Sequence, residues 1–277
     1  MCEISVILPV YNNEKRMHQA VESILNQSFT DFEIILTISD FTDETMSMVR
    51  PFDDKRIRFT NESVSVKSTL GKYIAFMHTN YVMHPDRLKI QYALMEAEPS
   101  ITVCTSWVKQ TGNQKPTNDV MKEQSSVGLI ENPLMVFLLG NCIIRPTAMI
   151  RKLFLSEQQI QHVDGDFKLW AEIAKHGGQF YVDTQTLMYG ITPEKAHDEE
   201  QLRQSSEVVI NEIVDFLAGT NKKNYPELTI VLENFRKLQS KEMMTHQDIV
   251  GFFHHFFAKN KDDLFHGQYK SQGNDNI

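Results

Sequence analysis

Apolar residues in the first hundred positions alternate between strand-like runs and helical stripes. Residues 4–8 form an apolar, β-rich run ended by Pro9, which is typical of a buried strand in a parallel sheet. Asn13 can cap a helix that begins near Glu14, because apolar residues then recur at helical spacing. Further strands are predicted at residues 32–38, 56–60, 73–77 and 101–108, and further helices near Thr42 and from Pro85 to about Glu98. This alternation predicts an α/β sheet with helices on both faces.

The pattern becomes less regular after residue 108. A polar stretch predicts a surface loop or hairpin, and Gly177 and Gly178 end a predicted helix. The expected elements here are a loop at 109–124, a helix at 133–139, a strand at 145–150, a helix at 166–176, and strands at 180–183 and 186–190.

From about residue 199 the pattern is almost purely helical. Three apolar stripes at helical spacing follow one another, and the last residues are polar. We therefore expect an α/β domain over residues 1–195, a C-terminal α-helical extension over 196–267, and a disordered tail over 268–277.

Charge and composition narrow the function classes. The chain has 277 residues and a formal net charge of −8, and an acidic surface repels phosphate backbones, so no nucleic-acid partner is expected. No apolar run approaches the roughly 18 residues of a membrane span. The three cysteines show no metal-ligand spacing. We expect a cytoplasmic protein, either free or peripheral at the inner face of the membrane.

Polar residues follow three of the predicted strands directly. They are Pro9-Val10-Tyr11-Asn12, Ile38-Ser39-Asp40 and Met77-His78-Thr79-Asn80. In open α/β sheets the ligand lies beyond the carboxyl ends of the strands. A single polar tip is ordinary for a strand that exits into solvent, but three together predict a binding site.

Residues 4 to about 107 resemble the nucleotide-binding half of glycosyltransferase family 2, and the resemblance continues weakly to Gly190. Order and spacing agree with that family except for a deletion near residues 61–70. The blocks that carry the resemblance are Ile7-Leu8-Pro9-Val10-Tyr11-Asn12, Ser23-Ile24-Leu25-Asn26-Gln27-Ser28-Phe29, Asp31-Phe32-Glu33-Ile34-Ile35, Thr42-Asp43-Glu44-Thr45 and Gly71-Lys72-Tyr73-Ile74-Ala75-Phe76.

The resemblance implies the GT-A fold, a Rossmann-like mixed sheet, and a nucleotide-diphosphate sugar lying across the strand ends. Carboxylates after the second strand hold the base in that family, but here their positions fall on Ile38 and Ser39, with Asp40 shifted by one residue. Lys67 is the one cation left near the deleted stretch. The implied donor-binding residues are Pro9, Val10, Tyr11, Asn12, Ser39, Asp40 and Lys67.

The family's acidic metal-binding triplet is missing. His78-Thr79-Asn80 stands where an Asp-x-Asp would bind a divalent cation on the diphosphate, and Tyr81 replaces a further acid. An imidazole nitrogen is tolerable as a ligand for Mn²⁺ but poor for Mg²⁺. The loss of two carboxylates should weaken divalent binding by about a thousandfold or more. We expect Mn²⁺ or Mg²⁺ to be held weakly by His78 and Asn80, or replaced by a cationic side chain, or not used.

The acceptor side keeps its carboxylate. Gly165-Asp166-Phe167-Lys168-Leu169-Trp170 resembles the family's Glu-Asp-x-x-Leu-Trp element, with Asp166 at the position of the catalytic base. An acid at the start of a helix is also a common N-cap or first-turn residue, and Asp164 shares that option.

Two functions remain open. The first is a bacterial glycosyltransferase that moves a sugar, with inversion, from a nucleotide-diphosphate sugar to a glycan or lipid-linked acceptor in surface polysaccharide assembly. The second is a catalytically inactive homologue that binds a sugar or a partner, with Tyr81 filling the pocket. The aromatic stripe at Phe252, Phe253, Phe256 and Phe257 predicts packing onto the catalytic domain, a homodimer seam, or an interfacial membrane helix, in that order of preference.

Overall fold

A computed structural model describes residues 2–10, 14–38, 51–61, 64, 66–110, 128–130, 133–137, 141, 143–155 and 166–190, with isolated positions between 208 and 241. Its strands are β1 (Ile4–Val10), β2 (Phe32–Ile38), β3 (Ile57–Thr60), β4 (Tyr73–Phe76), β5 (Tyr81–Met83), β6 (Ile101–Gln110), β7 (Gly128–Ile130), β8 (Met149–Arg151) and β9 (Gln179–Gly190). Its helices are α1 (Glu14–Leu25), α3 (Arg87–Ala97), α5 (Pro133–Phe137) and α6 (Asp166–Lys175), with 3₁₀ turns η1 (Val66–Ser68), η2 (Arg145–Thr147) and η3 (Lys152–Phe154).

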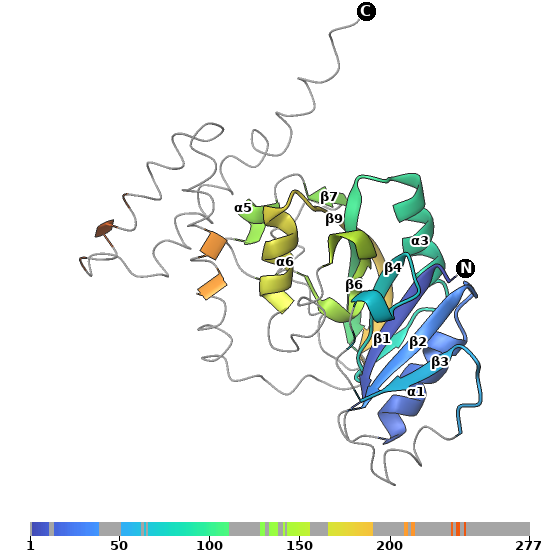
Figure 1. The fold of residues 1–277 in the computed structure, drawn as a ribbon. Helices are drawn as coiled ribbons and strands as arrows, with labels where there is room; N and C mark the ends of the chain where they lie inside the picture. The colour runs from blue at the N-terminus through green and yellow to red at the C-terminus, as the bar shows by residue number, and fades with distance from the viewer. Residues whose placement is uncertain are drawn as a thin grey trace, which may run out of the picture. The chain divides into compact units, whose positions relative to one another are not determined.

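All the described strands join one mixed sheet (Figure 1). Its strand order is β3-β2-β1-β4-β8-β6-β9-β5, and β7 pairs with β9. Strands β3, β2, β1 and β4 run parallel, whereas β8 is antiparallel to both of its neighbours. The carboxyl ends of β1, β2 and β4 therefore meet at one edge of the sheet, as the sequence predicts.

The chain folds as two compact units. The first contains residues 1–130 and 142–196 and carries the whole sheet, and the second contains residues 131–141 and 197–277. The predicted helical extension and tail lie almost entirely outside the described residues, and so does the aromatic stripe at 252–257. No helix in the described part of the chain is long and apolar enough to cross a membrane.

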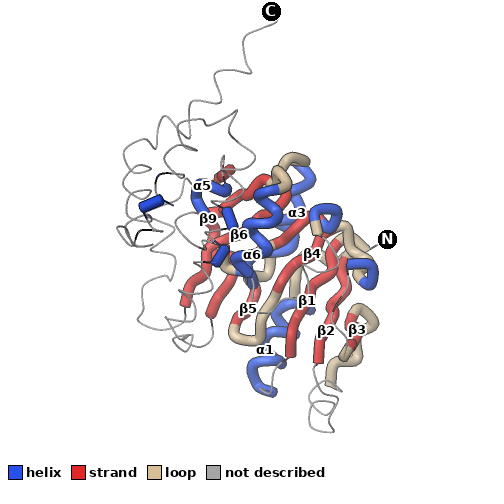
Figure 2. The backbone as a smooth tube through the Cα atoms, turned by 60° about the vertical axis from the view of Figure 1, so that its left-hand side comes forward, coloured by secondary structure: helices blue, strands red, loops and turns tan. Residues whose placement is uncertain are grey.

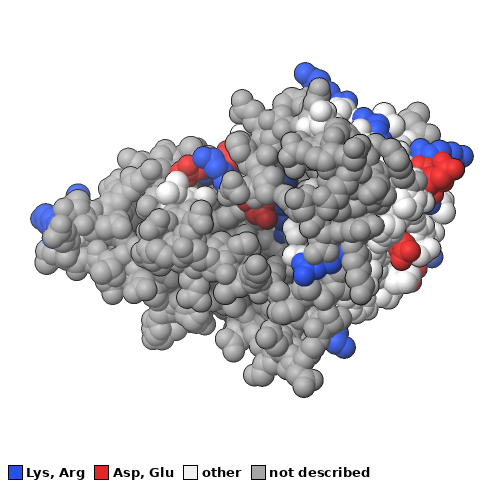
Figure 3. Space-filling view, turned by 90° about the horizontal axis from the view of Figure 1, so that it is seen from below, with Lys and Arg blue, Asp and Glu red and all other residues white. Residues whose placement is uncertain are grey.

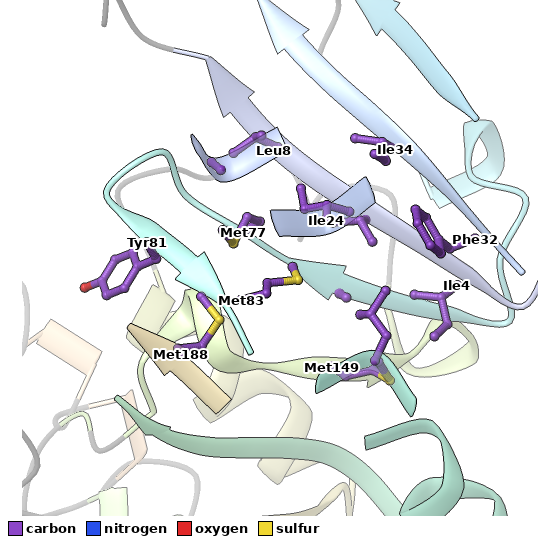
Figure 4. Close-up of a cluster of buried hydrophobic side chains, with 14 of the residues drawn as sticks. Ile4, Leu8, Ile24, Phe32, Ile34, Met77, Tyr81, Met83, Met149 and Met188 are labelled. Atoms are coloured by element: carbon purple, nitrogen blue, oxygen red, sulfur yellow. The ribbon is translucent and has the colours of Figure 1, made fainter. Parts of the chain in front are cut away.

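Side chains alternate strictly across β1, β2 and β4. Ile4, Val6, Leu8 and Val10 face a core that α1 and α3 complete, and they lie opposite alternate residues of β2 in register. Methionines from β5, β8 and β9, together with Met77 just after β4, fill the far side of this core (Figure 4). Helix α6 covers the other face of the sheet (Figure 2). Its Trp170 packs edge-on against Phe180 of β9. The expectation of helices on both faces is confirmed.

Two local predictions were wrong in detail, and a short strand was missed. Residues 145–150 were expected as one strand, but η2 precedes the short β8, because Pro146 lacks the N–H that a strand ladder needs and favours a helical turn start. The two strands expected at 180–190 are one strand, β9, with an irregular register near Asp183 to Thr186. Strand β5 was not predicted, since three residues give too short a periodic signal.

The end of α1 is tied to the start of α3 by Gln27, which lies in the block that carries the family resemblance. Its side-chain amide donates to the carbonyl oxygens of Ser23 and His84, and its Oε1 accepts the backbone N–H of Leu88 at 3.0 Å. Ser28 adds a hydrogen bond to Asp86. This block therefore connects two helices through polar side chains.

Glycine is required at position 71 by close backbone packing. Its N–H donates to Ser5 Oγ at 2.8 Å, and a Cβ placed there would lie 2.4 Å from the backbone nitrogen of Ser5. Ser5 in turn donates to Glu33, which also accepts the N–H of Leu70. These bonds join the amino ends of β1, β2 and β4.

The buried guanidinium of Arg87 connects the centre of the sheet to α3. Arg87 is completely buried and donates to the carbonyl oxygens of Phe76 and Ala148 at 3.2 and 3.3 Å. It also donates to Gln91, whose amide reaches the carbonyl oxygen of Thr147. Burial lowers the pKa of Arg87 to about 9, so the group stays positively charged at neutral pH.

Gly71→Ala should lower the free energy of unfolding by about 3 kcal/mol, because the added methyl group overlaps backbone atoms that cannot move aside. Gly177→Ala is the matched control. Gly177 has φ +80° with open space around it, so only the left-handed backbone strain of about 1–2 kcal/mol applies. Urea denaturation of both variants measures the difference, and equal losses would contradict the steric argument.

Arg87→Met should lower the free energy of unfolding by about 2–4 kcal/mol, because buried carbonyl oxygens lose their donors while the apolar stem is kept. Lys72→Met is the control. Lys72 and its partner Glu96 are both exposed, and surface ion pairs contribute about 0–1 kcal/mol. Urea denaturation that found equal losses in the two variants would show that Arg87 does not anchor the sheet.

Candidate active site

The loop that follows β4 is a tight turn with fixed geometry. The backbone N–H of Tyr81 donates to the carbonyl oxygen of His78 at 3.0 Å, which closes a four-residue turn between β4 and β5. Within it, the N–H of Asn80 donates to Nδ1 of His78 at 3.1 Å, and Thr79 is buried. We call residues 78–80 the β4 tip. Its shape is set by these hydrogen bonds.

An arginine from α1 holds the last residue of the β4 tip. Arg16 lies in the first turn of α1, and its Nη1 donates to Oδ1 of Asn80 at 3.0 Å. A cationic side chain was one of the expected replacements for the metal, but the sequence did not indicate which residue would supply it. Arg16 lies 64 residues from Asn80 in sequence, so only the fold brings the two together.

The contacts of the β4 tip do not fit a divalent cation. Hard cations take oxygen ligands with free lone pairs, above all carboxylates. Here Oδ1 of Asn80 accepts a bond from a guanidinium, and Nδ1 of His78 accepts a backbone N–H. A neutral imidazole that accepts at Nδ1 carries its proton on Nε2, which is then a donor rather than a metal ligand. Among the described residues, no group of three His, Cys, Asp or Glu side chains could hold a metal ion.

Asp166 reaches the sheet through an ion pair with Arg145. Nη1 of Arg145 donates to Oδ1 of Asp166 at 2.8 Å, and both side chains are largely shielded from solvent, with 16% and 33% exposed. The guanidinium carbon of Arg145 lies 4.4 Å from the ring centre of Phe76, the last residue of β4. The predicted base is therefore linked by contacts to the strand that ends in the β4 tip.

Arg145 was not predicted as a site residue, because residues 145–150 were assigned to a strand. In the structure it begins η2, and Thr147 of that turn bonds to Thr105 in β6. The available signal was a single cation directly before a proline in the apolar segment Cys142-Ile143-Ile144-Arg145-Pro146. Such a charge needs a partner when its surroundings are buried.

Asp166 is also the first residue of α6, where the helix dipole favours a carboxylate. This position agrees with the first-turn interpretation as well as with the base. The pairing with Arg145, 21 residues away, is what directs the carboxylate toward β4. Asp164 lies outside the described residues.

The predicted donor-binding residues are only partly described. Pro9 and Val10 close β1 at the expected edge of the sheet, with the Val10 side chain buried in the core, so that only its backbone can face a donor. Tyr11, Asn12, Ser39 and Asp40 lie outside the described residues. Figure 3 shows the protein from this end of the sheet, and acidic and basic side chains lie side by side among the described residues.

Lys67 lies at the other end of the sheet. It belongs to η1, and the next residue, Ser68, accepts a hydrogen bond from Arg58 through its carbonyl oxygen. Leu70 bonds to Glu33 near the amino end of β2. This placement does not support a donor-binding role for Lys67.

Tyr81 is buried, with 4% of its surface exposed. Its ring meets that of His78 edge-on, with 6.3 Å between ring centres, and its hydroxyl points away from the methionine core (Figure 4). Because Tyr11 and Ser39 are not described, the predicted role of Tyr81 as a plug stays a prediction.

Comparison with known proteins gives the site its context. The family model described as glycosyl transferase family 2 matches residues 5–157. An uncharacterized glycosyltransferase of Rickettsia prowazekii is 22% identical over 281 residues, covering 91% of this chain and 87% of the relative. A UDP-Glc:alpha-D-GlcNAc-diphosphoundecaprenol beta-1,3-glucosyltransferase of Escherichia coli is 28% identical over 102 residues, covering 33% of this chain and 40% of that enzyme.

Two solved structures show the same fold. Staphylococcus aureus TarS 1–349, in complex with UDP-GlcNAc, matches with a TM-score of 0.59 and 17% identity over 80% of this chain and 74% of that one. A mannosyltransferase of Pyrobaculum calidifontis, in complex with GDP-Man and Mn²⁺, matches with a TM-score of 0.51 and 12% identity over 95% of this chain and 87% of that one.

These findings confirm both the resemblance and the fold drawn from the sequence. The sheet and its helices form a GT-A fold, and the family model covers more than half of the chain. The chain belongs to glycosyl transferase family 2.

Proposed function

We propose that the protein is an active glycosyltransferase. It transfers a sugar, with inversion, from a nucleotide-diphosphate sugar to a glycan or lipid-linked acceptor. The proposal rests on the contact series Asp166–Arg145–Phe76, which connects the acceptor-side carboxylate to the strand that ends at the donor side.

The chemistry follows from these positions. The acceptor hydroxyl oxygen attacks the anomeric carbon of the donor sugar, and Asp166 takes the hydroxyl proton as general base. The bond between the anomeric carbon and the β-phosphate oxygen breaks, and its electron pair leaves with the nucleoside diphosphate. Attack from the side opposite the leaving group inverts the anomeric centre. Arg145 acts as a positioning residue, because its bond to Oδ1 orients the Asp166 carboxylate.

The donor and acceptor classes are supported by the relatives. TarS was solved with UDP-GlcNAc and the Pyrobaculum enzyme with GDP-Man, which supports a nucleotide-diphosphate sugar donor. On this proposal the donor lies over Tyr11, Asn12, Ser39 and Asp40, the residues that the family resemblance implies. The name of the Escherichia coli relative includes a diphosphoundecaprenol acceptor, which supports a lipid-linked acceptor. On this proposal the protein works in surface polysaccharide assembly, peripherally at the inner face of the membrane that holds the acceptor. A homodimer through the C-terminal helices belongs to the same proposal.

A second function has one observation in its favour. The β4 tip lacks the acidic triplet, and its polar atoms bond to Arg16 and to each other. An inactive homologue that binds a sugar or a partner would tolerate this loss. An active transferase turns over a nucleotide-diphosphate sugar, whereas an inactive homologue binds its ligand without turnover.

Asp166→Asn should lower kcat by about 10²–10⁴-fold, because an amide cannot take the acceptor proton. Its free energy of unfolding should fall by about 2 kcal/mol at most, because the amide oxygen can still accept a hydrogen bond from Arg145, although the charge that pairs with Arg145 and with the helix dipole is lost. The assay measures release of nucleoside diphosphate from UDP-Glc, UDP-GlcNAc and GDP-Man, with a GlcNAc-diphospholipid as acceptor.

Glu172→Gln is the matched control, since it removes a carboxylate of the same helix whose partner is Lys175. It should keep full activity. Unchanged turnover in Asp166→Asn would remove Asp166 from the mechanism. Absence of turnover in the wild-type protein with every donor, together with saturable sugar or nucleotide binding, would favour the inactive homologue.

A further inference from the structure

Arg16 occupies an electrostatically unfavourable place within its own helix. It lies in the first turn of α1, where the helix dipole disfavours a cation by about 0.3–1 kcal/mol. Its side chain nevertheless turns to the β4 tip and holds Asn80. A residue that is unfavourable for its own helix is expected at a functional site, where binding or catalysis requires it.

A guanidinium and an imidazole lie at the β4 tip, where a metal site would have oxygen ligands. Oδ1 of Asn80 and Nδ1 of His78 both act as acceptors within the protein, which leaves the His78 ring with a donor at Nε2 in its neutral form. Donors and cations recognise a phosphate group and repel a divalent cation.

A second positive charge lies under the same strand end. Arg87 is buried against the carbonyl oxygen of Phe76, and its pKa of about 9 keeps it charged at neutral pH. No carboxylate among the described residues forms an ion pair with it. A charge in a low-dielectric interior acts over a longer distance than one in water, so Arg87 contributes a positive potential at the carboxyl end of β4.

We propose that the guanidinium of Arg16 takes the place of the divalent cation at the β4 tip and binds the β-phosphate of the donor. This inference rests on the proposed function and specifies how the leaving group is held. A guanidinium has five N–H donors in a fixed fork, a geometry that allows it to hold Asn80 and a phosphate oxygen together. As the bond from the anomeric carbon to the β-phosphate oxygen breaks, that oxygen gains negative charge, and Arg16 stabilises it.

The proposal predicts nucleotide binding that does not depend on a metal. We would titrate the full chain with UDP, UMP, GDP and GMP by calorimetry, first in EDTA and then with Mn²⁺. The wild-type protein should bind one nucleoside diphosphate in EDTA, more tightly than the matching monophosphate. Its dissociation constant should change by less than about threefold when Mn²⁺ replaces EDTA.

Arg16→Met should weaken binding of the diphosphate by about 10–150-fold, the range expected for a hydrogen bond to a charged group, and weaken the monophosphate less. Arg16→Lys keeps the charge and should recover part of the affinity. Lys89→Met is the control, because Lys89 is exposed on α3 and its loss lowers the net charge equally. It should bind like the wild type, which separates a contact at Arg16 from a general effect of charge.

A double variant tests the proposal in the opposite direction, by removing Arg16 and restoring a carboxylate that can bind a metal ion. Arg16→Met combined with Asn80→Asp removes the cation and returns one carboxylate, so diphosphate binding should become at least about tenfold tighter with Mn²⁺ than in EDTA. This gain of metal dependence cannot arise from misfolding of the variant.

The possible outcomes distinguish a failure of the Arg16 role from a failure of the transferase. Wild-type binding that requires Mn²⁺, or Arg16→Met that binds like the wild type, would overturn the role of Arg16 while the proposed transferase stands. No binding of any nucleoside diphosphate by the wild type, with or without Mn²⁺, would overturn the proposed function and this inference with it.

Discussion

The buried guanidinium of Arg87 holds the carboxyl end of β4 in position. A charge removed from water is costly unless hydrogen bonds replace its hydration. Here the carbonyl oxygens of Phe76 and Ala148 and the amide of Gln91 supply those bonds. The side-chain amide of Gln91 donates in turn to the carbonyl oxygens of Cys104 and Thr147. One side chain of α3 thereby sets the positions of β4 and η2, and through β4 and Gln91 it is coupled to β6.

The candidate site depends on this arrangement. The β4 tip begins two residues after Phe76, and Arg145 begins the turn that contains Thr147. If β4 and η2 moved relative to each other, the contact between Arg145 and the Phe76 ring would be lost, and Asp166 would lose its link to the sheet. Asp166 is therefore connected to the buried Arg87 through Arg145 and Phe76.

Three arginines of the described chain lie around the end of β4, and one of them, Arg145, is paired with Asp166. Arg16 approaches from α1 on one face, Arg145 covers Phe76 on the other, and Arg87 lies beneath. The family resemblance implied carboxylates here that would hold a cation. The reaction needs a positive charge at this place whether a metal ion or a guanidinium supplies it, because the departing diphosphate gains negative charge that must be stabilised. A guanidinium meets that need without a bound ion, at the cost of the adaptable coordination that a metal provides.

Long and regular patterns in the sequence are enough to locate much of the fold. Periodicity placed β1, β2, α1 and α6 because burial on one face repeats over several turns or residue pairs, and family-specific blocks placed the β4 tip and Asp166. Periodicity failed at residues 145–150, where a proline overrode an apolar run, and at β5, which is too short to show a period. Which charges meet is settled by the folded chain alone. Arg16 and Asn80, and Arg145 and Asp166, are 64 and 21 residues apart, and a single sequence holds no local signal for a hydrogen bond between distant side chains.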